Sequence, residues 1–386
     1  MTNLEPKAFS KEGVRNWPVT LTLGLTFLAA IILVPWYGIT QGFSAWAWGF
    51  FVFFMLFTGV GIGSGYHRLW SHRTYKAHPA WEWLMAVAGG MAVQNSILIW
   101  AARHRVHHRS VDDDDKDPYS IGRGFWYAHV GWMLRDYRSG QVDYKIVPDL
   151  KKNKIVMWQH KHYLELVLLT NVGLPMLLGW MVGDFWGVFL LAGLGRLVLN
   201  HHFTFFINSL AHMWGKQPFT DENSARDNWF IAIFTYGEGY HNYHHLFQND
   251  YRNGIRWFNI DLNKWVIACA SFLGLASDLR RTPQFKILRA RLHMDFKRAR
   301  QRLEADPANP RWKELLDTLE GEYAEYLGTI KEWQNLQMEK VQASKEKLQA
   351  SKEKLQDTLD RSFRELEKSL QMQRKRVALL AAQAYG

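Results

Sequence analysis

Cysteine is almost absent from this 386-residue chain, which contains only Cys269. A single cysteine cannot form an internal disulfide, so a disulfide-stapled extracellular scaffold is excluded. It also leaves no cysteine set for a zinc or iron–sulfur site. We expect no cleavable signal peptide, because the first 17 residues, MTNLEPKAFSKEGVRNW, are polar over too long a stretch.

Aromatic side chains, in contrast, are abundant: 19 Trp, 23 Phe and 15 Tyr, with 48% apolar residues overall. Such rings are enriched where a bilayer meets water. The mean hydropathy is nevertheless only −0.25, so a membrane part must be joined to a large polar part. The net charge of +11 fits an anionic leaflet or an anionic substrate as well as nucleic acid. Nucleic-acid binding has little support, because the basic residues are spread over several loops and a mixed-charge helix.

Four apolar stretches of about 20 residues are predicted to cross a hydrocarbon core of about 30 Å. They comprise residues 19–39, 44–65, 163–182 and 185–210, and their connectors carry almost no charge, which favours two hairpins. Lys and Arg gather before, between and after the hairpins, so we expect both termini and the intervening segment on the cytoplasmic side. The alternative, buried helices of a large soluble protein, is disfavoured by the length of the stretches.

A further apolar stretch, residues 80–102, is not expected to span the membrane. It contains Glu82, Gln94 and Asn95, and a histidine motif flanks it on each side. A fifth span would place those two motifs on opposite sides of the bilayer. We therefore predict an interfacial or re-entrant helix there.

The chain changes character after Pro283. Residues 284–386 are rich in Lys, Arg, Glu, Gln, Leu and Ala, and the unit QASKEKL occurs in tandem at 342–348 and 349–355. A period of seven predicts a coiled coil or a long amphipathic helix. Self-association and a solvated single helix both remain open, because the apolar seam is short. The prolines between 306 and 310 predict a break between two helices.

Nine of the 16 histidines fall into four short motifs. The motifs are HRLWSH, HRVHH, NSLAH and HNYHH, which contain His67 and His72, then His104, His107 and His108, then His212, and finally His241, His244 and His245. In HxxHH the second and third histidines lie within about 60° of the first on a helix, so three imidazoles face one way. Asn208 and His212 also share a face. His67 and His72 are about 140° apart on an ideal helix, so they need a helix end or serve different metals.

Nine imidazoles are too many for one metal, and all four motifs lie at the same predicted membrane depth. Imidazole suits iron, zinc, copper and nickel. Two metals with four or five ligands each, leaving an open position, indicate oxygen chemistry at iron. Ligating histidines usually donate their other N–H to a carboxylate, which makes Asp117, Glu238 and the run Asp112 to Asp115 candidate supports. For the run of aspartates, a solvated acidic loop is the favoured interpretation.

These motifs resemble the membrane acyl-CoA Δ9 (stearoyl-CoA-type) desaturases. The resemblance rests on HRLWSHRTYKAH, WAARHRVHH followed by DPYSIGRGFWYAHVGW, NSLAH and GEGYHNYHH. Motif order and approximate spacing are kept over about residues 20–285, and the resemblance does not extend to the tail after about residue 290.

The resemblance implies an all-α integral membrane fold, with four transmembrane helices and a cytosolic helical cap that holds a di-iron centre. It divides the chain into a cytosolic tail (1–16), a membrane desaturase domain (17–283) and a charged helical or coiled-coil extension (284–386). By motif position, the nine histidines named above would bind two Fe2+ ions, and Asn208 would hold one of them through a water. Members of the family introduce a cis double bond, here Δ9, into a saturated acyl chain with O2 as co-substrate. Electrons would come from a separate carrier, a ferredoxin-like protein or cytochrome b5 with its reductase, since the HPGG of a fused haem domain is absent. We expect a bacterial inner membrane rather than the endoplasmic reticulum.

Substrate contacts are where the sequence departs from the resemblance. Asn95 matches a position that contacts the CoA portion, and Trp100 matches a channel-lining Trp. Ala102-Arg103 and Met133 to Tyr137 stand where vertebrate members have an Arg-Asp and an Arg-Lys pair, and Phe205 stands where a Trp lines the acyl tunnel. We therefore name Asn95, Trp100, Arg103 and Phe205 as substrate contacts and acyl-CoA as the substrate. The alternatives are an acyl-lipid substrate, a histidine-rich membrane hydroxylase or alkane monooxygenase, and a catalytically silent membrane scaffold.

Overall fold

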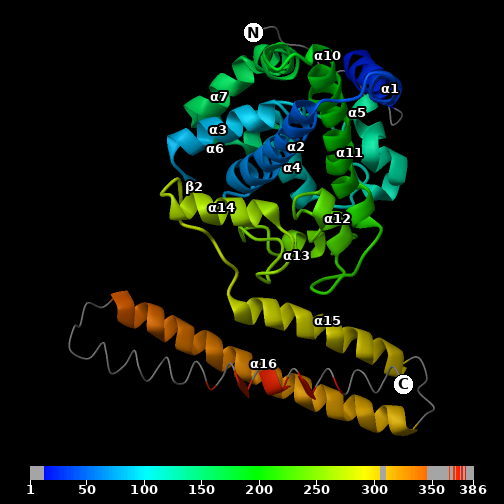
Figure 1. Ribbon diagram of the computed structural model, residues 1–386. Coiled ribbons are helices and arrows are strands. Elements are labelled where there is room, and N and C mark those ends of the chain that lie inside the picture. The colour runs from blue at the N-terminus through cyan, green and yellow to red at the C-terminus, as the bar shows by residue number, and fades with distance from the viewer. Residues whose placement is uncertain are drawn as a thin grey trace. The chain divides into compact units, whose positions relative to one another are not determined.

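The computed structural model describes residues 13–304 and 310–345, together with residues 365, 368, 369, 371–373, 375, 376 and 379. The chain divides into two compact units. One comprises residues 13–217 and 222–281, and the other comprises residues 218–221 and the described residues from 282 onward. Figure 1 shows that regular structure in both units is almost entirely helical.

Four helical segments are long and apolar enough to cross a membrane, which confirms the four predicted spans. They are Trp17–Thr40, Ala45–Ser71, Tyr163–Met181 and Phe185–His212. The first is α1 (Trp17–Thr40), where Leu25, Ile32 and Trp36 are each more than half exposed. Exposed apolar side chains on a span suit contact with lipid, because the helix satisfies its own backbone polar groups. The chain is therefore an integral membrane protein.

The other three spans are composite. The second joins α2 (Ala45–Val60) to the π-helix η1 (Gly61–Ser71). The third is α8 (Tyr163–Leu168), η5 (Leu169–Gly173) and α9 (Leu174–Met181). The fourth is α10 (Phe185–Val188), η6 (Phe189–Gly195), α11 (Arg196–Asn208) and η7 (Leu210–His212).

The carboxylate of Asp184 connects the two helical hairpins through hydrogen bonds. Asp184 caps α10 by accepting from the backbone N–H of Gly187 at 2.9 Å. It also accepts from the Tyr37 hydroxyl and the Ser44 backbone N–H, both at 3.1 Å. Because Tyr37 and Ser44 belong to the first hairpin, both turns lie at the same end of the bundle, as the charge pattern predicts.

The stretch predicted to be interfacial or re-entrant is two helices. They are α3 (Pro79–Gly90) and α4 (Ile97–Arg109), and Val93 and Asn95 between them have positive φ values of 55° and 74°. Neither helix is among the four candidate spans of the described residues. The prediction that this stretch does not cross the membrane is therefore consistent with the structure.

Shorter elements complete the membrane unit. They are η2 (Ile121–Arg123), η3 (Tyr127–Gly131), α5 (Trp132–Leu134), η4 (Tyr144–Ile146), α6 (Pro148–Lys152), α7 (Lys154–Lys161), α12 (Trp229–Phe234), α13 (His241–Leu246) and α14 (Leu262–Phe272). Two antiparallel strand pairs join distant segments: β1 (Val14–Arg15) with β3 (Arg135–Asp136), and β2 (Lys76–Ala77) with β4 (Ala276–Ser277).

The second unit contains α15 (Gln284–Glu304) and α16 (Pro310–Lys345), which lie on either side of the predicted proline break. Phe296 stacks on Tyr323 with ring centroids 4.2 Å apart, and Phe285 meets Trp333 at 5.6 Å. The tandem QASKEKL repeats lie largely outside the described residues, so the coiled coil stays a prediction. The domain boundaries at 16/17 and 283/284 also remain predictions.

Candidate metal centre

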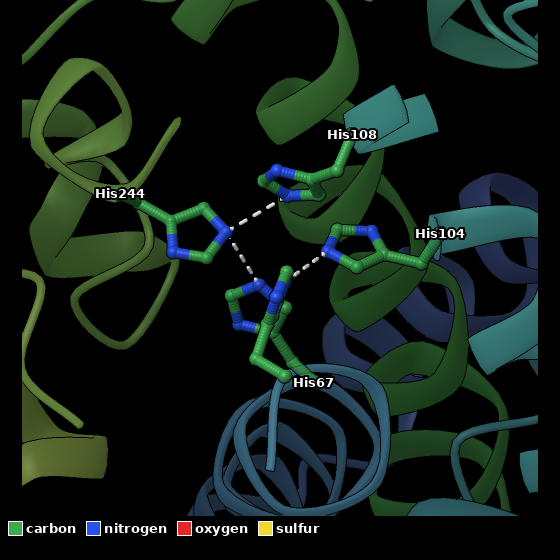
Figure 2. A group of neighbouring side chains, drawn as sticks. His67, His104, His108 and His244 are labelled. Atoms are coloured by element: carbon green, nitrogen blue, oxygen red, sulfur yellow. Dashed lines mark hydrogen bonds between the residues drawn. The ribbon is translucent and has the colours of Figure 1, made fainter. Parts of the chain in front are cut away.

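The nine motif histidines converge in two groups, each of which could hold a metal ion. The ligand atoms within a group lie within 4.8 Å of one another, and the groups comprise His67, His72, His104, His108 and His244, and His107, His212, His241 and His245. Figure 2 shows four rings of the first group, from η1, α4 and α13, turned towards a common centre. Two groups of five and four histidines match the number of metals inferred from the sequence.

Each HxxHH motif contributes to both groups. On α4, His104 and His108 belong to the first group and His107 to the second. On α13, His241 and His245 belong to the second group and His244 to the first. On a helix, the side chain at position i+4 lies slightly to one side of the side chain at position i. The side chain at position i+3 lies to the other side of it. The prediction that three imidazoles face one way was therefore too coarse, because each motif spans the gap between two sites.

A π-helix brings His67 and His72 together. The backbone N–H of His72 donates to the carbonyl of His67 at 3.0 Å, an i→i+5 bond. Residues five apart then fall on nearly the same face, and the two ring centroids are 4.7 Å apart. Single π-turns are frequent at functional sites. The alternative that these two histidines serve different metals is not supported, because both lie in the first group.

Carboxylates support histidines of both groups. Buried Asp117 accepts from Nδ1 of His107 at 2.9 Å, and Nδ1 of His67 lies 2.9 Å from Glu238. Of the aspartate run, Asp112 reaches the centre: it accepts from the Ser224 hydroxyl, which in turn contacts Nδ1 of His212 at 2.7 Å.

The rest of the aspartate run is peripheral. Asp113 pairs with Lys116 at 2.7 Å, and Asp114 accepts from Ser120 at 2.6 Å. Asp114 and Asp115 are both exposed. Most of the aspartate run is therefore a solvated loop, whereas its first residue, Asp112, supports the metal site.

The facing ring nitrogens fit a bound cation. A carboxylate only accepts, so the His107 and His67 nitrogens that face Asp117 and Glu238 carry protons, and their Nε2 atoms have lone pairs. Those Nε2 atoms lie 3.3 Å from Nε2 of His245 and 2.9 Å from Nε2 of His244. Lone pairs that converge in this way need a proton or a cation between them, and imidazole is a common metal ligand.

Burial favours the neutral, metal-binding form of these rings. It lowers the pKa of six imidazoles outside the membrane spans well below the ordinary histidine value, and neighbouring histidines lower it further; the six are His72, His104, His108, His241, His244 and His245. Unprotonated imidazole is the form that coordinates metals. The donor set therefore fits two transition-metal ions.

A buried ion network lies behind the first group. The Arg68 guanidinium donates to Glu238 and to Asp261, in each case at 2.9 Å. Burial alone would raise the pKa of the Glu238 carboxyl, but Arg68 and His67 hold it at about 2. Glu238 is therefore a carboxylate at neutral pH and can orient His67.

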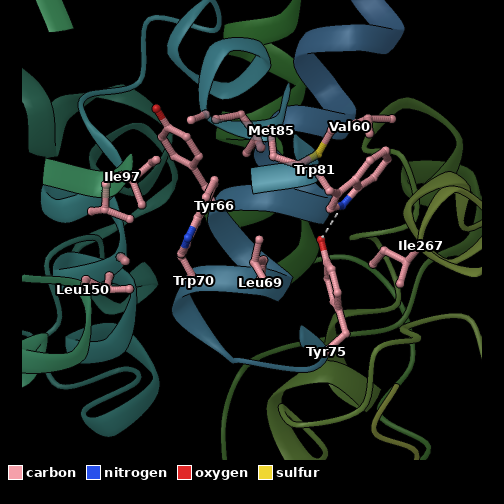
Figure 3. Packing of buried hydrophobic residues seen from close by; sticks show 14 of the residues in the cluster. Val60, Tyr66, Leu69, Trp70, Tyr75, Trp81, Met85, Ile97, Leu150 and Ile267 are labelled. Atoms are coloured by element: carbon pink, nitrogen blue, oxygen red, sulfur yellow. Dashed lines mark hydrogen bonds between the residues drawn. The ribbon is translucent and has the colours of Figure 1, made fainter. Parts of the chain in front are cut away.

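The hydrophobic core fixes the helices that carry the first two motifs (Figure 3). It includes Tyr66 and Trp70 of η1, Met85 of α3 and Ile97 of α4, all 3% exposed or less. Tyr75 accepts from the Trp81 indole at 3.2 Å and donates to the Ser64 carbonyl at 2.8 Å. Close packing of these large side chains leaves the helices little room to shift. The histidines of η1 and α4 thus stand on rigid elements.

A cavity of about 520 Å³ reaches His67, His104 and His241. The predicted substrate contacts all lie on its wall, namely Asn95, Trp100, Arg103 and Phe205, and so does Asn208 at the end of α11. Trp100 stacks on His104 at 4.8 Å, and Arg103 donates to the Gly140 carbonyl at 3.1 Å. The roles of these five residues remain predictions.

Sequence reasoning missed four residues of the site. Ser224 belongs to no motif, and the Tyr119 hydroxyl lies 3.1 Å from Nδ1 of His104 without any spacing signal. Asp261, which pairs with Arg68, is 193 residues away in sequence. Arg68 lies inside HRLWSH and Tyr119 inside DPYSIGRGFWYAHVGW, so the positions of these two could have drawn attention.

The model of the fatty acid desaturase family matches residues 43–268. Over 239 residues the chain is 46% identical to the "Probable acyl-CoA desaturase" of Schizosaccharomyces pombe, covering 62% of this chain and 50% of that protein. It is 39% identical to "Acyl-CoA desaturase 1" of Saccharomyces cerevisiae, covering 74% and 57%. It is 38% identical to the "sn-2 palmitoyl-lipid 9-desaturase" of Nostoc sp., covering 67% and 88%. The chain thus spans about half the length of the two yeast relatives.

Proposed function

The chain belongs to the fatty acid desaturase family, and from that premise we propose that it introduces a cis double bond into a saturated fatty acyl chain at a di-iron centre. The observation that carries the proposal is the pair of histidine groups beside one cavity. An unactivated methylene C–H resists side-chain acids and bases, so the reaction needs a metal and O2.

We assign the nine histidines as ligands of two iron ions and Asn208 as a ligand through water. When bound, iron would supply the oxidising power to break two C–H bonds on adjacent carbons. The balance is one acyl chain, O2, two electrons and two protons giving the alkene and two waters. The two electrons would come from an external donor, ferredoxin-like or a cytochrome b5 with its reductase.

The protein's own contribution is to position the acyl chain of the substrate and to exclude water. Trp100 and Phe205 offer apolar surface near the histidines, so an extended acyl chain can lie against them. Arg103, Arg135 and Asn95 add polar groups to the same wall. A fixed distance from these groups to the histidines would select which carbons react. We propose Δ9 as the position on this basis and on the resemblance.

Acyl-CoA is the proposed carrier, and its anionic headgroup suits Arg103 and Arg135. An acyl-lipid is the second candidate, because the cavity wall includes Leu23 of α1 and Leu164 of α8, which belong to two membrane spans. The Nostoc relative, whose name specifies a lipid-linked chain, supports testing it. We place the site on the cytoplasmic side of a bacterial inner membrane.

The test is gas chromatography of fatty acids from a desaturase-deficient host that expresses the chain. A new cis monoene supports the proposal, and the bond position is read from dimethyl disulfide adducts. A hydroxylated chain without a monoene would identify a hydroxylase instead. Assays on isolated membranes with acyl-CoA or with acyl-lipid separate the two carriers.

A further inference from the structure

The cavity beside the histidines has a charged end and an end inside the membrane spans. The charged wall residues other than histidine all lie outside the four spans, and they are Arg103, Arg135, Asp136 and Glu238. Gly59, in contrast, lies on the wall within the second span, eight residues before His67. At 1.5 Å per helical residue, Gly59 is about 12 Å from His67 along the helix axis. An acyl chain whose headgroup meets the arginines would place its methyl end near Gly59.

The side chain of Tyr236 lies across this membrane end of the cavity. On the second span the wall begins at Gly59 and on the fourth at His201, and no described residue that precedes them in those two spans contributes to it. Tyr236 is part of the wall, but its hydroxyl reaches past both residues. The hydroxyl donates to the Met55 carbonyl at 3.0 Å and lies 3.2 Å from Oδ1 of Asn200. Both of these partners are buried behind the wall. The ring is therefore anchored to two spans.

Gly59 packs directly against the Tyr236 ring. A Cβ at position 59 would lie 2.2 Å from Cε2 of that ring, which is far closer than van der Waals contact allows. The absence of a side chain at Gly59 therefore leaves the space in which the ring lies. Close packing on one side and the hydroxyl contacts at the far end together fix where the ring can be.

The backbone of Tyr236 is held in a strained conformation. Its φ is +57°, a value that a residue with a bulky side chain rarely adopts. The Tyr236 carbonyl accepts from Nδ2 of Asn263 at 3.0 Å, and the next N–H, that of Gly237, donates to the Ala232 carbonyl at 2.8 Å. Strain of this kind persists only where surrounding contacts enforce it, and it is concentrated at functional sites. A tyrosine where glycine would fit without strain indicates that the side chain itself is needed.

We propose that Tyr236 closes the membrane end of the acyl cavity and limits how many carbons extend beyond the reacting methylenes. The ring sets the depth that is open to the methyl end of the substrate, and its hydroxyl contacts keep it from moving aside. The inference rests on the proposed function, since it takes the cavity as the acyl site. It assigns the selection of chain length to Tyr236 and the position of the double bond to the charged end of the cavity.

The test measures monoene ratios from isolated membranes supplied with a mixture of saturated acyl chains of graded length. Tyr236→Ala deepens the cavity, so the ratio of long to short products should rise about tenfold or more. The position of the double bond, counted from the carboxyl carbon and read from dimethyl disulfide adducts, should not change. Tyr236→Phe keeps the ring and should keep the ratio. Trp229→Ala removes an exposed ring of α12 outside the cavity wall and is the matched control.

A product ratio is internal to each sample, so it does not depend on how much protein folds. Tyr236→Leu should give an intermediate ratio, and it decides the question if Tyr236→Ala does not reach the membrane fraction. Active Ala and Leu variants with the ratio of the unchanged protein would overturn the inference while leaving the proposed function intact. A moved double bond would overturn it as well, because the ring would then act on the charged end. If the unchanged protein forms no monoene, the proposed function is wrong, and this inference falls with it.

Discussion

Arg68 donates a hydrogen bond to one oxygen of Glu238 at 2.9 Å, and the other oxygen of that carboxylate lies 2.9 Å from Nδ1 of His67. Arg68 is 1% exposed and also donates to buried Asp261 at 2.9 Å. A cation between two carboxylates therefore holds the group that orients a histidine of the metal centre. Removing it would strand two buried negative charges.

Arg68→Met should consequently destabilise the protein by about 3–5 kcal/mol, because breaking a buried ion network leaves uncompensated charge. The measurement is thermal unfolding in detergent micelles. Arg73→Met is the control, since its guanidinium is 64% exposed and lies 3.8 Å from Asp149. Equal unfolding temperatures for the two variants would show that the buried network contributes little.

Asp117→Asn should weaken metal binding without unfolding the protein. The carboxylate is fully buried and accepts from His107 at 2.9 Å and from the Asp112 backbone N–H at 3.1 Å. Asparagine keeps the shape but removes the charge that raises the basicity of His107. We expect iron affinity to fall about 10- to 100-fold, measured as iron retained against chelator. Asp115→Asn, at an exposed position, should retain iron normally; matching losses in both variants would contradict the assignment.

His108→Ala and His245→Ala each remove one ligand, the first from the group of five and the second from the group of four. Both should abolish desaturation while membrane insertion is unchanged, because each remaining group lacks a full ligand set. Fatty-acid profiles of the expressing host give the activity, and membrane fractionation gives insertion. His162→Ala is the control, as this ring is 39% exposed and lies in neither group. Monoene production by either ligand variant would refute the di-iron assignment.

The fold and the gathering of the nine motif histidines into two groups that could hold metal ions were predictable because their signals are local. Hydropathy locates the four spans to within a few residues, and HxxHH places histidines together by helical period alone. The carboxylates Asp117 and Glu238 were expected from the known preference of ligating histidines. These inferences need no knowledge of which segments meet in space.

Other features of the site depend on geometry that the sequence does not encode locally. The π-helix that aligns His67 with His72 departs from the ideal period, so an α-helical wheel placed them about 140° apart. Ser224 donates to Asp112, which is 112 residues away in sequence, and no motif or spacing near either residue predicts the contact. The 2+1 division of each HxxHH motif becomes visible only when α4 and α13 face each other.

Phe205→Trp should shift the preferred acyl chain towards shorter lengths. Phe205 is 6% exposed and forms part of the cavity wall, so a larger indole leaves less room for methylenes. Differences of one or two methylenes in such a pocket change selectivity about tenfold or more. Competition assays with saturated chains of graded length measure the ratio. Phe230→Trp, at an exposed ring outside the cavity wall, should leave the ratio unchanged, and an equal shift there would argue against a role for the cavity.

Gly61→Ala should disturb both the fold and the metal centre, because Gly61 is where η1 approaches α3. A Cβ there would lie 2.5 Å from the backbone carbon of Ala88, and backbone cannot move aside as a flexible side chain can. We expect a loss of about 1–3 kcal/mol from overpacking, with reduced iron content because η1 also carries His67. Gly49→Ala is the matched control in the same span, since its Cβ would meet nothing within 4 Å. That change should be neutral or stabilise the helix by up to about 1 kcal/mol. Unfolding temperature and iron per chain, measured for both variants, test whether close packing of η1 on α3 sets the position of the first histidine motif.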